Sequence, residues 1–268
     1  MIVVEENKSY NQVVGSSSMP FLNSIIQKYA VASNYYANGV DSLPNYFMLT
    51  VGQTLTTGAT YSDVVTADNV VRELKTAGKT WKAYAESIPS VGYVGGDVPP
   101  YVKVHNPFAY LSDVLNDSTV KQNIVGMDQF TTDLTANQLP NYSFIIPDDN
   151  SNSHDCPPNM ATCTLADTLS YSDNWLKQQL QPLMNSPAWA NTLLIITYDE
   201  SDGSTVQGGG QVATVVAGPF IKTGYKIATA LQHESMLRLS LKALGVTVYP
   251  GQAATAPDIN DAFSAPPQ

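Results

Sequence analysis

The chain has 268 residues, of which 43% are hydrophobic and 13% are charged, and its formal net charge is −10 with an isoelectric point near 4.5. This length suffices for one large domain with a sizeable core, so we expect residues 1–268 to form a single domain. The acidity disfavours nonspecific binding to nucleic acid or to anionic membranes, and we expect no nucleic-acid partner. An anionic substrate would need local neutralisation, which a bound metal would supply.

Membrane and targeting signals are weak in this sequence. No apolar run approaches 20 residues, so we expect no transmembrane segment. No signal peptide is visible, and because the first strand begins almost at Met1, we expect that a targeting segment has been removed. Cys156 and Cys163 are spaced wrongly for a redox motif and are too few for a zinc site. A local disulfide is favoured over two free thiols, and it indicates a secreted or periplasmic protein.

Strand-like and helix-like segments alternate along the chain. We expect strands at 2–4, 79–84, 142–146, 193–198 and 212–217, and helices at 19–30, 47–51, 68–77, 170–184 and 233–244. Polar or glycine-rich connections are expected at 92–101, 150–164 and 203–210, and the Ala- and Pro-rich tail is expected to be a surface loop. We interpret Gly208–Gly210 as part of a mobile surface loop. The alternation predicts an α/β fold with a mostly parallel sheet covered on both faces.

Two of the apolar strands end at acidic residues. The residues that follow them are Glu5, Glu6 and Asn7 after the first strand, and Asp199 and Glu200 after the strand at 193–198. In open α/β sheets, ligands bind beyond the carboxyl ends of such strands. Oxygen ligands suit a hard divalent cation, so the two groups predict a metal site. The alternative for any single acid is a solvated strand end or a helix cap.

Ser42 and three histidines are the candidate catalytic residues. Ser42 precedes an apolar helix, where its hydroxyl would lie near backbone N–H donors and the positive end of the helix dipole. It is either a plain N-cap or a nucleophile activated by a metal. His105, His154 and His233 lie in loops or at the edge of an element, where a proton donor or phosphate-binding group belongs. Each histidine alone is also explained as a surface or hydrogen-bonded structural residue.

Seven short motifs occur in an order that resembles a known family. They are residues 6–10 (ENKSY), 42–46 (SLPNY), 81–86 (WKAYAE), 105–108 (HNPF), 154–156 (HDC), 197–200 (TYDE) and 233–238 (HESMLR). Together they resemble the phosphoesterase family of bacterial and fungal acid phosphatases and phospholipases C, which belongs to the alkaline phosphatase-like superfamily. The resemblance spans nearly the whole chain.

The resemblance implies a three-layer α/β/α sandwich with a metal beyond the strand ends. The metal ligands that it implies are Glu6, Asn7, Asp199 and Glu200. One or more Ca²⁺, Mg²⁺, Mn²⁺ or Zn²⁺ ions would fit these ligands. Ser42 becomes the nucleophile, which attacks phosphorus and forms a phosphoserine that water then hydrolyses.

The resemblance also gives roles to the polar residues around Ser42. Asn7 would help to hold the phosphoryl oxygens, and His154 and His233 would bind phosphate or protonate the leaving oxygen. His105 and Asp155 are expected to bind or orient the substrate.

The expected function is a metal-dependent phosphomonoesterase, that is, an acid phosphatase, acting on a small phosphoester or a phospholipid headgroup. A phospholipase C or another phosphodiesterase of the same fold is the first alternative, and a catalytically inactive metal- or ligand-binding relative is the second. The sequence departs from the family pattern at Val40-Asp41, where a His-Pro pair is usual before the SLPNY motif. This departure motivates the inactive alternative.

Overall fold

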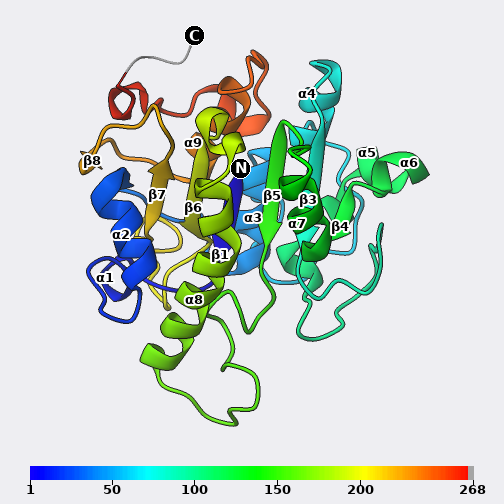
Figure 1. The fold of residues 1–268 in the computed structure, drawn as a ribbon. Helices are drawn as coiled ribbons and strands as arrows, with labels where there is room; N and C mark the ends of the chain where they lie inside the picture. The colour runs from blue at the N-terminus through cyan, green and yellow to red at the C-terminus, as the bar shows by residue number, and fades with distance from the viewer. Residues whose placement is uncertain (265–268) are drawn as a thin grey trace.

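A computed structural model describes residues 1–264 of the chain, and eight strands in this range form one sheet (Figure 1). The sheet order is β4-β3-β5-β1-β6-β7-β2-β8. The strands are β1 (Ile2–Glu5), β2 (Ala30–Ala32), β3 (Trp81–Ala85), β4 (Ile124–Gly126), β5 (Tyr142–Ile146), β6 (Leu194–Tyr198), β7 (Thr214–Ala217) and β8 (Tyr225–Ile227). All pairs are parallel except those that β7 makes with β6 and β2. The prediction of a mostly parallel sheet is therefore confirmed.

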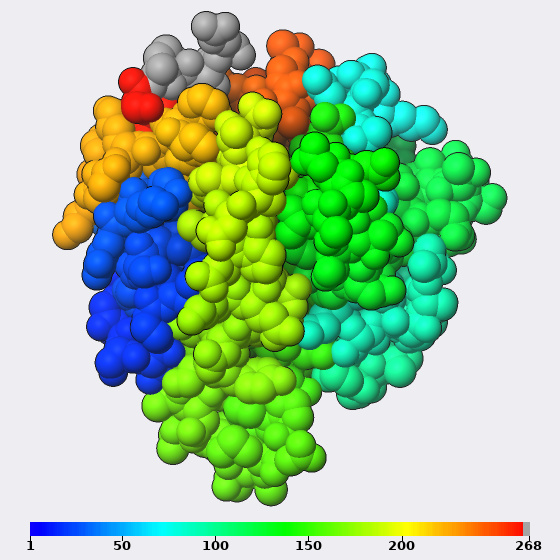
Figure 2. All heavy atoms as spheres, in the orientation of Figure 1, coloured from blue at the N-terminus to red at the C-terminus, as the bar shows by residue number. Residues whose placement is uncertain are grey.

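Helices cover both faces of the sheet and make a three-layer α/β/α sandwich. They are α1 (Tyr10–Val13), α2 (Pro20–Lys28), α3 (Ser42–Val51), α4 (Val70–Thr76), α5 (Ser112–Leu115), α6 (Ser118–Lys121), α7 (Met127–Thr135), α8 (Leu165–Met184) and α9 (His233–Lys242). In Figure 1, α2, α7 and α8 lie in front of the sheet and α3 and α9 lie behind it. Figure 2 shows α8 as a band across the front face. Among the described residues, no helix combines the length and apolarity needed to cross a membrane.

The central strands bring three carboxyl ends to one edge of the sheet. β1 lies between β5 and β6, with Ile2 paired to Phe144 on one side and to Ile195 on the other. Every residue of these three strands is buried, which is the pattern of strands covered on both faces. Because the three run parallel, the residues that follow them meet at the lower edge of the sheet in Figure 1.

The short elements are where the sequence expectations differ from the structure. β2, β4 and β8 have three residues each, too few to show a pattern, and they were not predicted. The helix α7 was also missed. The helix predicted at 47–51 begins earlier, at Ser42, and ends before Gly52, whose left-handed conformation (φ 69°) suits a glycine. Part of the predicted tail, residues 265–268, lies outside the described residues.

The glycine-rich segment 203–210 is buried at its C-terminal end. The interpretation of Gly208–Gly210 as part of a surface loop is therefore wrong for Gly209 and Gly210. Gly209 and Gly210 are buried. The N–H of Gly209 donates to the carbonyl of Ala37 (3.1 Å), and the N–H of Ala37 donates to the carbonyl of Gly210 (3.0 Å). A Cβ at position 209 would lie 1.9 Å from the carbonyl oxygen of Gly39. The glycine therefore allows this segment to pack against the chain that leads into α3.

We predict that Gly209→Ala destabilises the protein by about 1–3 kcal/mol, because the added methyl group meets backbone rather than a movable side chain. Urea unfolding followed by circular dichroism measures the change. Gly58→Ala is the matched control, since a Cβ there meets nothing within 4 Å. Equal unfolding midpoints for the two variants would contradict the prediction.

Candidate active site

Glu6 lies at the centre of the site, directly after β1, and is fully buried. Its Oε2 accepts a hydrogen bond from the Ser42 hydroxyl (3.0 Å), and its Oε1 accepts one from the Tyr46 hydroxyl (2.6 Å). Ser42 and Tyr46 are four residues apart on α3, so they project from the same side of the helix. One turn of α3 therefore holds both oxygens of a buried carboxylate.

Ser42 is the first residue of α3 and not its N-cap. The N-cap is Asp41, whose side chain makes no capping hydrogen bond. The Ser42 side chain is partly exposed and is directed to Glu6. The plain N-cap explanation of this serine is therefore wrong.

The Asn7 amide lies between two carboxylates beside Ser42. The orientation that satisfies its hydrogen bonds directs its nitrogen to Glu6 Oε2 (2.9 Å) and to Asp199 Oδ1 (3.1 Å). The backbone N–H of Asn7 also donates to Asp199 Oδ1 (3.1 Å). Asn7 has a left-handed backbone (φ 50°), which asparagine tolerates better than most residues. Two buried carboxylates, of Glu6 and Asp199, therefore flank one amide, and these carboxylate and amide groups are oxygen donors of the kind that fits a hard metal ion.

Burial raises the pKa of the acids in this cluster. Desolvation is the main cause for Glu6 and Asp199, and the charge of Asp199 raises the pKa of Glu6 further. The pKa of Glu200 is raised to about 9 by burial and then by the charges of Asp199 and Asp41. Asp199 Oδ2 and Glu200 Oε2 are buried, and neither has a hydrogen-bond partner within residues 1–264. Unpaired buried carboxylate oxygens are costly, and a divalent ion would satisfy them.

His105 connects this cluster to a second one. The ring is almost completely buried and stacks on Tyr46 with 5.4 Å between the ring centroids. Its Nε2 lies 3.4 Å from Glu6 Oε1, and its Nδ1 lies 3.2 Å from Asp149 Oδ1. Burial alone would raise the pKa of Asp149, but hydrogen bonding and the charge of His105, followed by the charge of His154, lower it.

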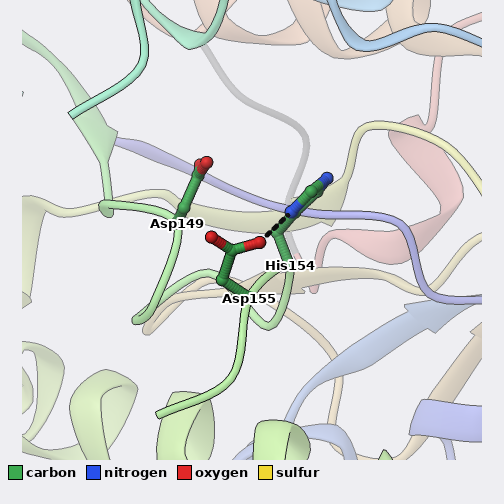
Figure 3. Close-up of side chains that lie close together, drawn as sticks. All are labelled: Asp149, His154 and Asp155. Carbon is green, nitrogen blue, oxygen red and sulfur yellow. Dashed lines mark hydrogen bonds and ion pairs between the residues drawn. The ribbon is translucent and has the colours of Figure 1, made fainter. Parts of the chain in front are cut away.

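The second cluster contains Asp149, His154 and Asp155, on the loop that follows β5 (Figure 3). Each side chain offers one ligand atom, and these atoms lie within 4.8 Å of one another, so the group could hold a metal ion. His154 Nδ1 lies 2.8 Å from Asp155 Oδ1. The loop is tied to the first cluster because the N–H of Glu6 donates to the carbonyl of Asn152 (2.9 Å).

His233 lies inside the protein, behind the acid cluster, and contacts the backbone of Asp199. Its Nδ1 accepts a hydrogen bond from the Tyr35 hydroxyl (2.8 Å), and its Nε2 donates to the backbone carbonyl of Asp199 (2.6 Å). The ring is fully buried, and burial lowers its pKa to about 4. Both ring nitrogens are occupied, so neither is free to contact a phosphoryl oxygen in this arrangement.

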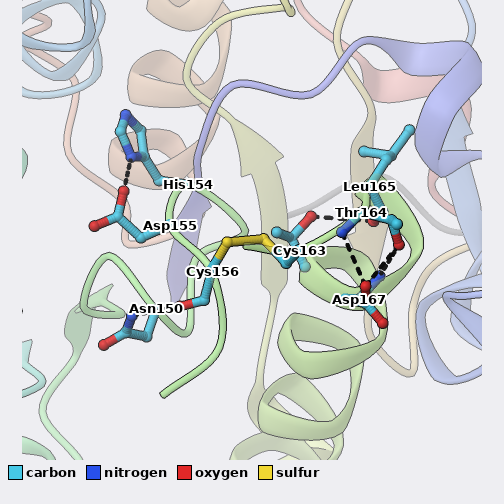
Figure 4. Close-up of a disulfide and its surroundings, with 9 residues drawn as sticks. Asn150, His154, Asp155, Cys156, Cys163, Thr164, Leu165 and Asp167 are labelled. Carbon is cyan, nitrogen blue, oxygen red and sulfur yellow. Dashed lines mark hydrogen bonds and ion pairs between the residues drawn. A yellow bond between two sulfur atoms is a disulfide. The ribbon is translucent and has the colours of Figure 1, made fainter. Parts of the chain in front are cut away.

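The predicted disulfide is present. Cys156 and Cys163 are joined, with 5.5 Å between their Cα atoms, and Figure 4 shows the bond between the loop of His154 and the start of α8. The side-chain amide of Asn150 donates to the carbonyl of Cys156 (2.7 Å). The bond therefore fastens the loop of the second cluster to a helix.

Tyr46 and Asp149 are site residues to which the sequence reasoning gave no role. The four-residue interval between Ser42 and Tyr46 was a usable signal, because it places both on one side of a helix. Asp149 follows β5 just as Glu6 follows β1, so its position after a buried strand was the second usable signal.

The fold is similar to that of solved structures, one of which comes from the alkaline phosphatase superfamily. The structure is similar to that of a protein in this superfamily from Vibrio parahaemolyticus, with a TM-score of 0.67 over 97% of this chain and 71% of that chain, at 15% identity. It is also similar to murine ectonucleotide pyrophosphatase / phosphodiesterase 5, with a TM-score of 0.63 over 98% of this chain and 99% of that chain, at 11% identity. At these identities the likeness concerns the fold.

Residues 16–247 match the model of the Phosphoesterase family, and the chain belongs to that family. It is 30% identical over 263 residues to the phosphatidylinositol-3-phosphatase of Mycobacterium tuberculosis, covering 97% of this chain and 81% of that protein. It is 28% identical over 249 residues to a probable acid phosphatase of Kluyveromyces lactis, covering 88% of this chain but only 55% of the yeast protein. The chain is therefore a hydrolase that acts on phosphoester bonds.

We predict that the chelator-treated protein loses stability as pH rises from 5 to 9. A carboxyl whose folded pKa is about 9 binds more protons in the folded than in the unfolded state over this range, so raising the pH favours unfolding. Glu200→Gln removes this group, and its Tm should fall less than that of the wild type. Thermal melts in EDTA measure the difference. Exposed Asp63→Asn is the control, and parallel curves for all three proteins would refute the prediction.

Proposed function

We propose that this protein is a metal-dependent phosphomonoesterase that uses Ser42 as its nucleophile. The observation that carries the proposal is the contact of the Ser42 hydroxyl with Glu6, beside the Asn7 amide and the Asp199 carboxylate. The names of two relatives, a phosphatidylinositol-3-phosphatase and a probable acid phosphatase, support a monoester substrate. We extend the proposal to small phosphomonoesters and to phosphorylated lipid headgroups.

The metal would be held by the four residues after β1 and β6, which are Glu6, Asn7, Asp199 and Glu200. A bound divalent cation would supply positive charge for the serine oxygen and for the phosphoryl group. Glu6 and Asn7 lie before the range matched by the family model, so their role rests on the geometry of this chain. The donors are mainly carboxylate and amide oxygens, which favours Mg²⁺, Ca²⁺ or Mn²⁺.

The chemical step begins at Ser42. Its O–H already donates to Glu6 Oε2, so the proton has an acceptor when the serine oxygen forms a bond to phosphorus. The bond from phosphorus to the leaving oxygen breaks, and phosphoserine results. Water then gives a proton to His154 as its oxygen bonds to phosphorus. The bond from phosphorus to the serine oxygen breaks, the proton on Glu6 returns to Ser42, and inorganic phosphate leaves. The Asn7 amide lies where it would contact the phosphoryl oxygens.

His154 is the proposed proton donor to the leaving oxygen. Its Nδ1 interacts with Asp155, so Nε2 is the nitrogen that would donate the proton. The side chain is partly exposed, so a substrate can reach it. We assign His233 a positioning role, since its ring donates to the Asp199 carbonyl. His105 would fix the distance between Glu6 and Asp149.

We also propose that the protein acts outside the reducing cytoplasm. The disulfide between Cys156 and Cys163 supports this, because such bonds persist in oxidising compartments.

Ser42→Ala is expected to lower the hydrolysis of 4-nitrophenyl phosphate about 1,000-fold or more, because it removes the nucleophile. Steady-state kinetics measure the rate, and mass spectrometry of acid-quenched enzyme detects phosphoserine on Ser42 in the wild type. Ser118→Ala is a matched control, since Ser118 is also the first residue of a helix with an aspartate N-cap. Unchanged turnover in a folded Ser42→Ala protein would refute the mechanism.

Monoesters should be preferred to diesters. A monoester presents three non-bridging oxygens to the cation and Asn7, and esterification removes one of them. We expect kcat/KM for 4-nitrophenyl phosphate to exceed that for 4-nitrophenyl phosphocholine on the order of tenfold or more. EDTA should abolish both activities and a divalent salt should restore them. A preference for the diester would favour a phospholipase C or another phosphodiesterase.

A further inference from the structure

A polar groove opens beside Asn7 and His154. Its volume is about 380 Å³, which lies in the usual range of small-molecule sites. Its walls come from the segment after β1, the loop after β5, the start of α8 and the loop after β6. We propose that this groove binds the alcohol part of the substrate and that this alcohol is a neutral polyol, such as a sugar or a cyclitol. The inference rests on the proposed function and specifies its substrate.

The position of the groove suits a leaving group. Asn7 and His154 line it, whereas Ser42 does not. In phosphoryl transfer the attacking and leaving oxygens lie roughly in line on opposite sides of phosphorus. A phosphoryl group held at Asn7 would therefore meet Ser42 on one side and present its ester oxygen to the groove, where His154 can protonate it.

The chemistry of the walls suits hydroxyl groups. Seven of the nine lining residues carry polar side chains, and the other two are Cys163 and Leu165. The polar set includes an amide, a carboxylate and the hydroxyls of Thr164 and Thr168. The hydroxyls of Thr164 and Thr168 already donate to Asp167 Oδ2 (2.7 Å) and to the Leu165 carbonyl (3.0 Å), so each keeps its oxygen as a further acceptor. A polyol hydroxyl can donate to such acceptors and to the Asp202 carboxylate, whereas an acyl chain offers them no donor.

One pair of side chains in the groove is held in place before any ligand arrives. The Gln12 amide nitrogen donates to Asp202 Oδ2 (3.0 Å), while its oxygen accepts from the N–H of Ser9 (2.8 Å). The N–H of Asp202 donates to the Ser9 hydroxyl (3.3 Å). Within residues 1–264, Asp202 Oδ1 has no hydrogen-bond partner. This oxygen is an acceptor that a substrate hydroxyl can reach.

The charge of the groove disfavours a second anionic group on the alcohol. Among the described residues, Lys8 and Asp202 are the only Lys, Arg, Asp or Glu residues that line it, and their charges cancel. Lys8 is almost buried, and its ammonium donates to the Asn7 carbonyl (3.2 Å). Beyond His154, whose proton goes to the leaving oxygen, a bisphosphate would need an additional free cation, which the groove does not offer.

The test compares glucose 6-phosphate with hexyl phosphate, an alkyl monoester that lacks the hydroxyls. The wild type should have the higher kcat/KM for glucose 6-phosphate, and Asp202→Ala should lower the ratio of the two values about tenfold, mainly through KM for the sugar. Gln12→Ala, which frees the carboxylate, should also lower the ratio. Asp63→Ala, an exposed aspartate outside the groove, should leave the ratio at the wild-type value.

Three results would overturn the inference. One is a wild-type ratio at or below one, and another is an equal loss on both substrates in Asp202→Ala. A higher kcat/KM for glucose 1,6-bisphosphate than for glucose 6-phosphate would overturn the assignment to a neutral alcohol. Absence of turnover on 4-nitrophenyl phosphate would overturn the proposed function itself, whereas turnover without a sugar preference would overturn only the groove assignment.

Discussion

The site depends on the parallel alignment of β5, β1 and β6 at the centre of the sheet. Their pairing fixes the height at which each strand ends, so Glu6 and Asp199 emerge side by side. The N–H of Asp199 donates to the carbonyl of Glu5 (3.0 Å), which extends the hydrogen bonding between β1 and β6 by one residue, to Asp199. The acids are thus held together by backbone geometry despite their mutual repulsion, and that repulsion is what makes a cation favourable there.

The sequence predicted the parts of the molecule that follow from local patterns. The buried strands and the acids after them were identified because an apolar run and its end are both local features. The partners of His233 were not predictable in this way, since Tyr35 and Asp199 come from other elements and meet the ring only in the fold. The number of domains and the chemical roles of the site residues stay predictions.

Asp41, where the sequence departs from the usual family pattern, affects the electrostatics of the acid cluster. It occupies the N-cap of α3, and its charge contributes to the raised pKa of Glu200. A histidine or proline near this position would not add that negative charge. The negative charge of Asp41 therefore favours binding of a cation to the acid cluster. Without a bound cation, the same charge increases the repulsion among the acids.

The disulfide has a consequence for resistance to proteolysis. It closes a small ring that includes exposed residues at 158–162, and exposed loop tips are preferred sites of proteolytic nicking. A protease that cuts inside this ring opens one peptide bond but leaves the two fragments covalently joined through Cys156 and Cys163. The loop of His154 and the start of α8 would then keep their relative positions. A cut within the ring would therefore disturb only the exposed residues between the two cysteines.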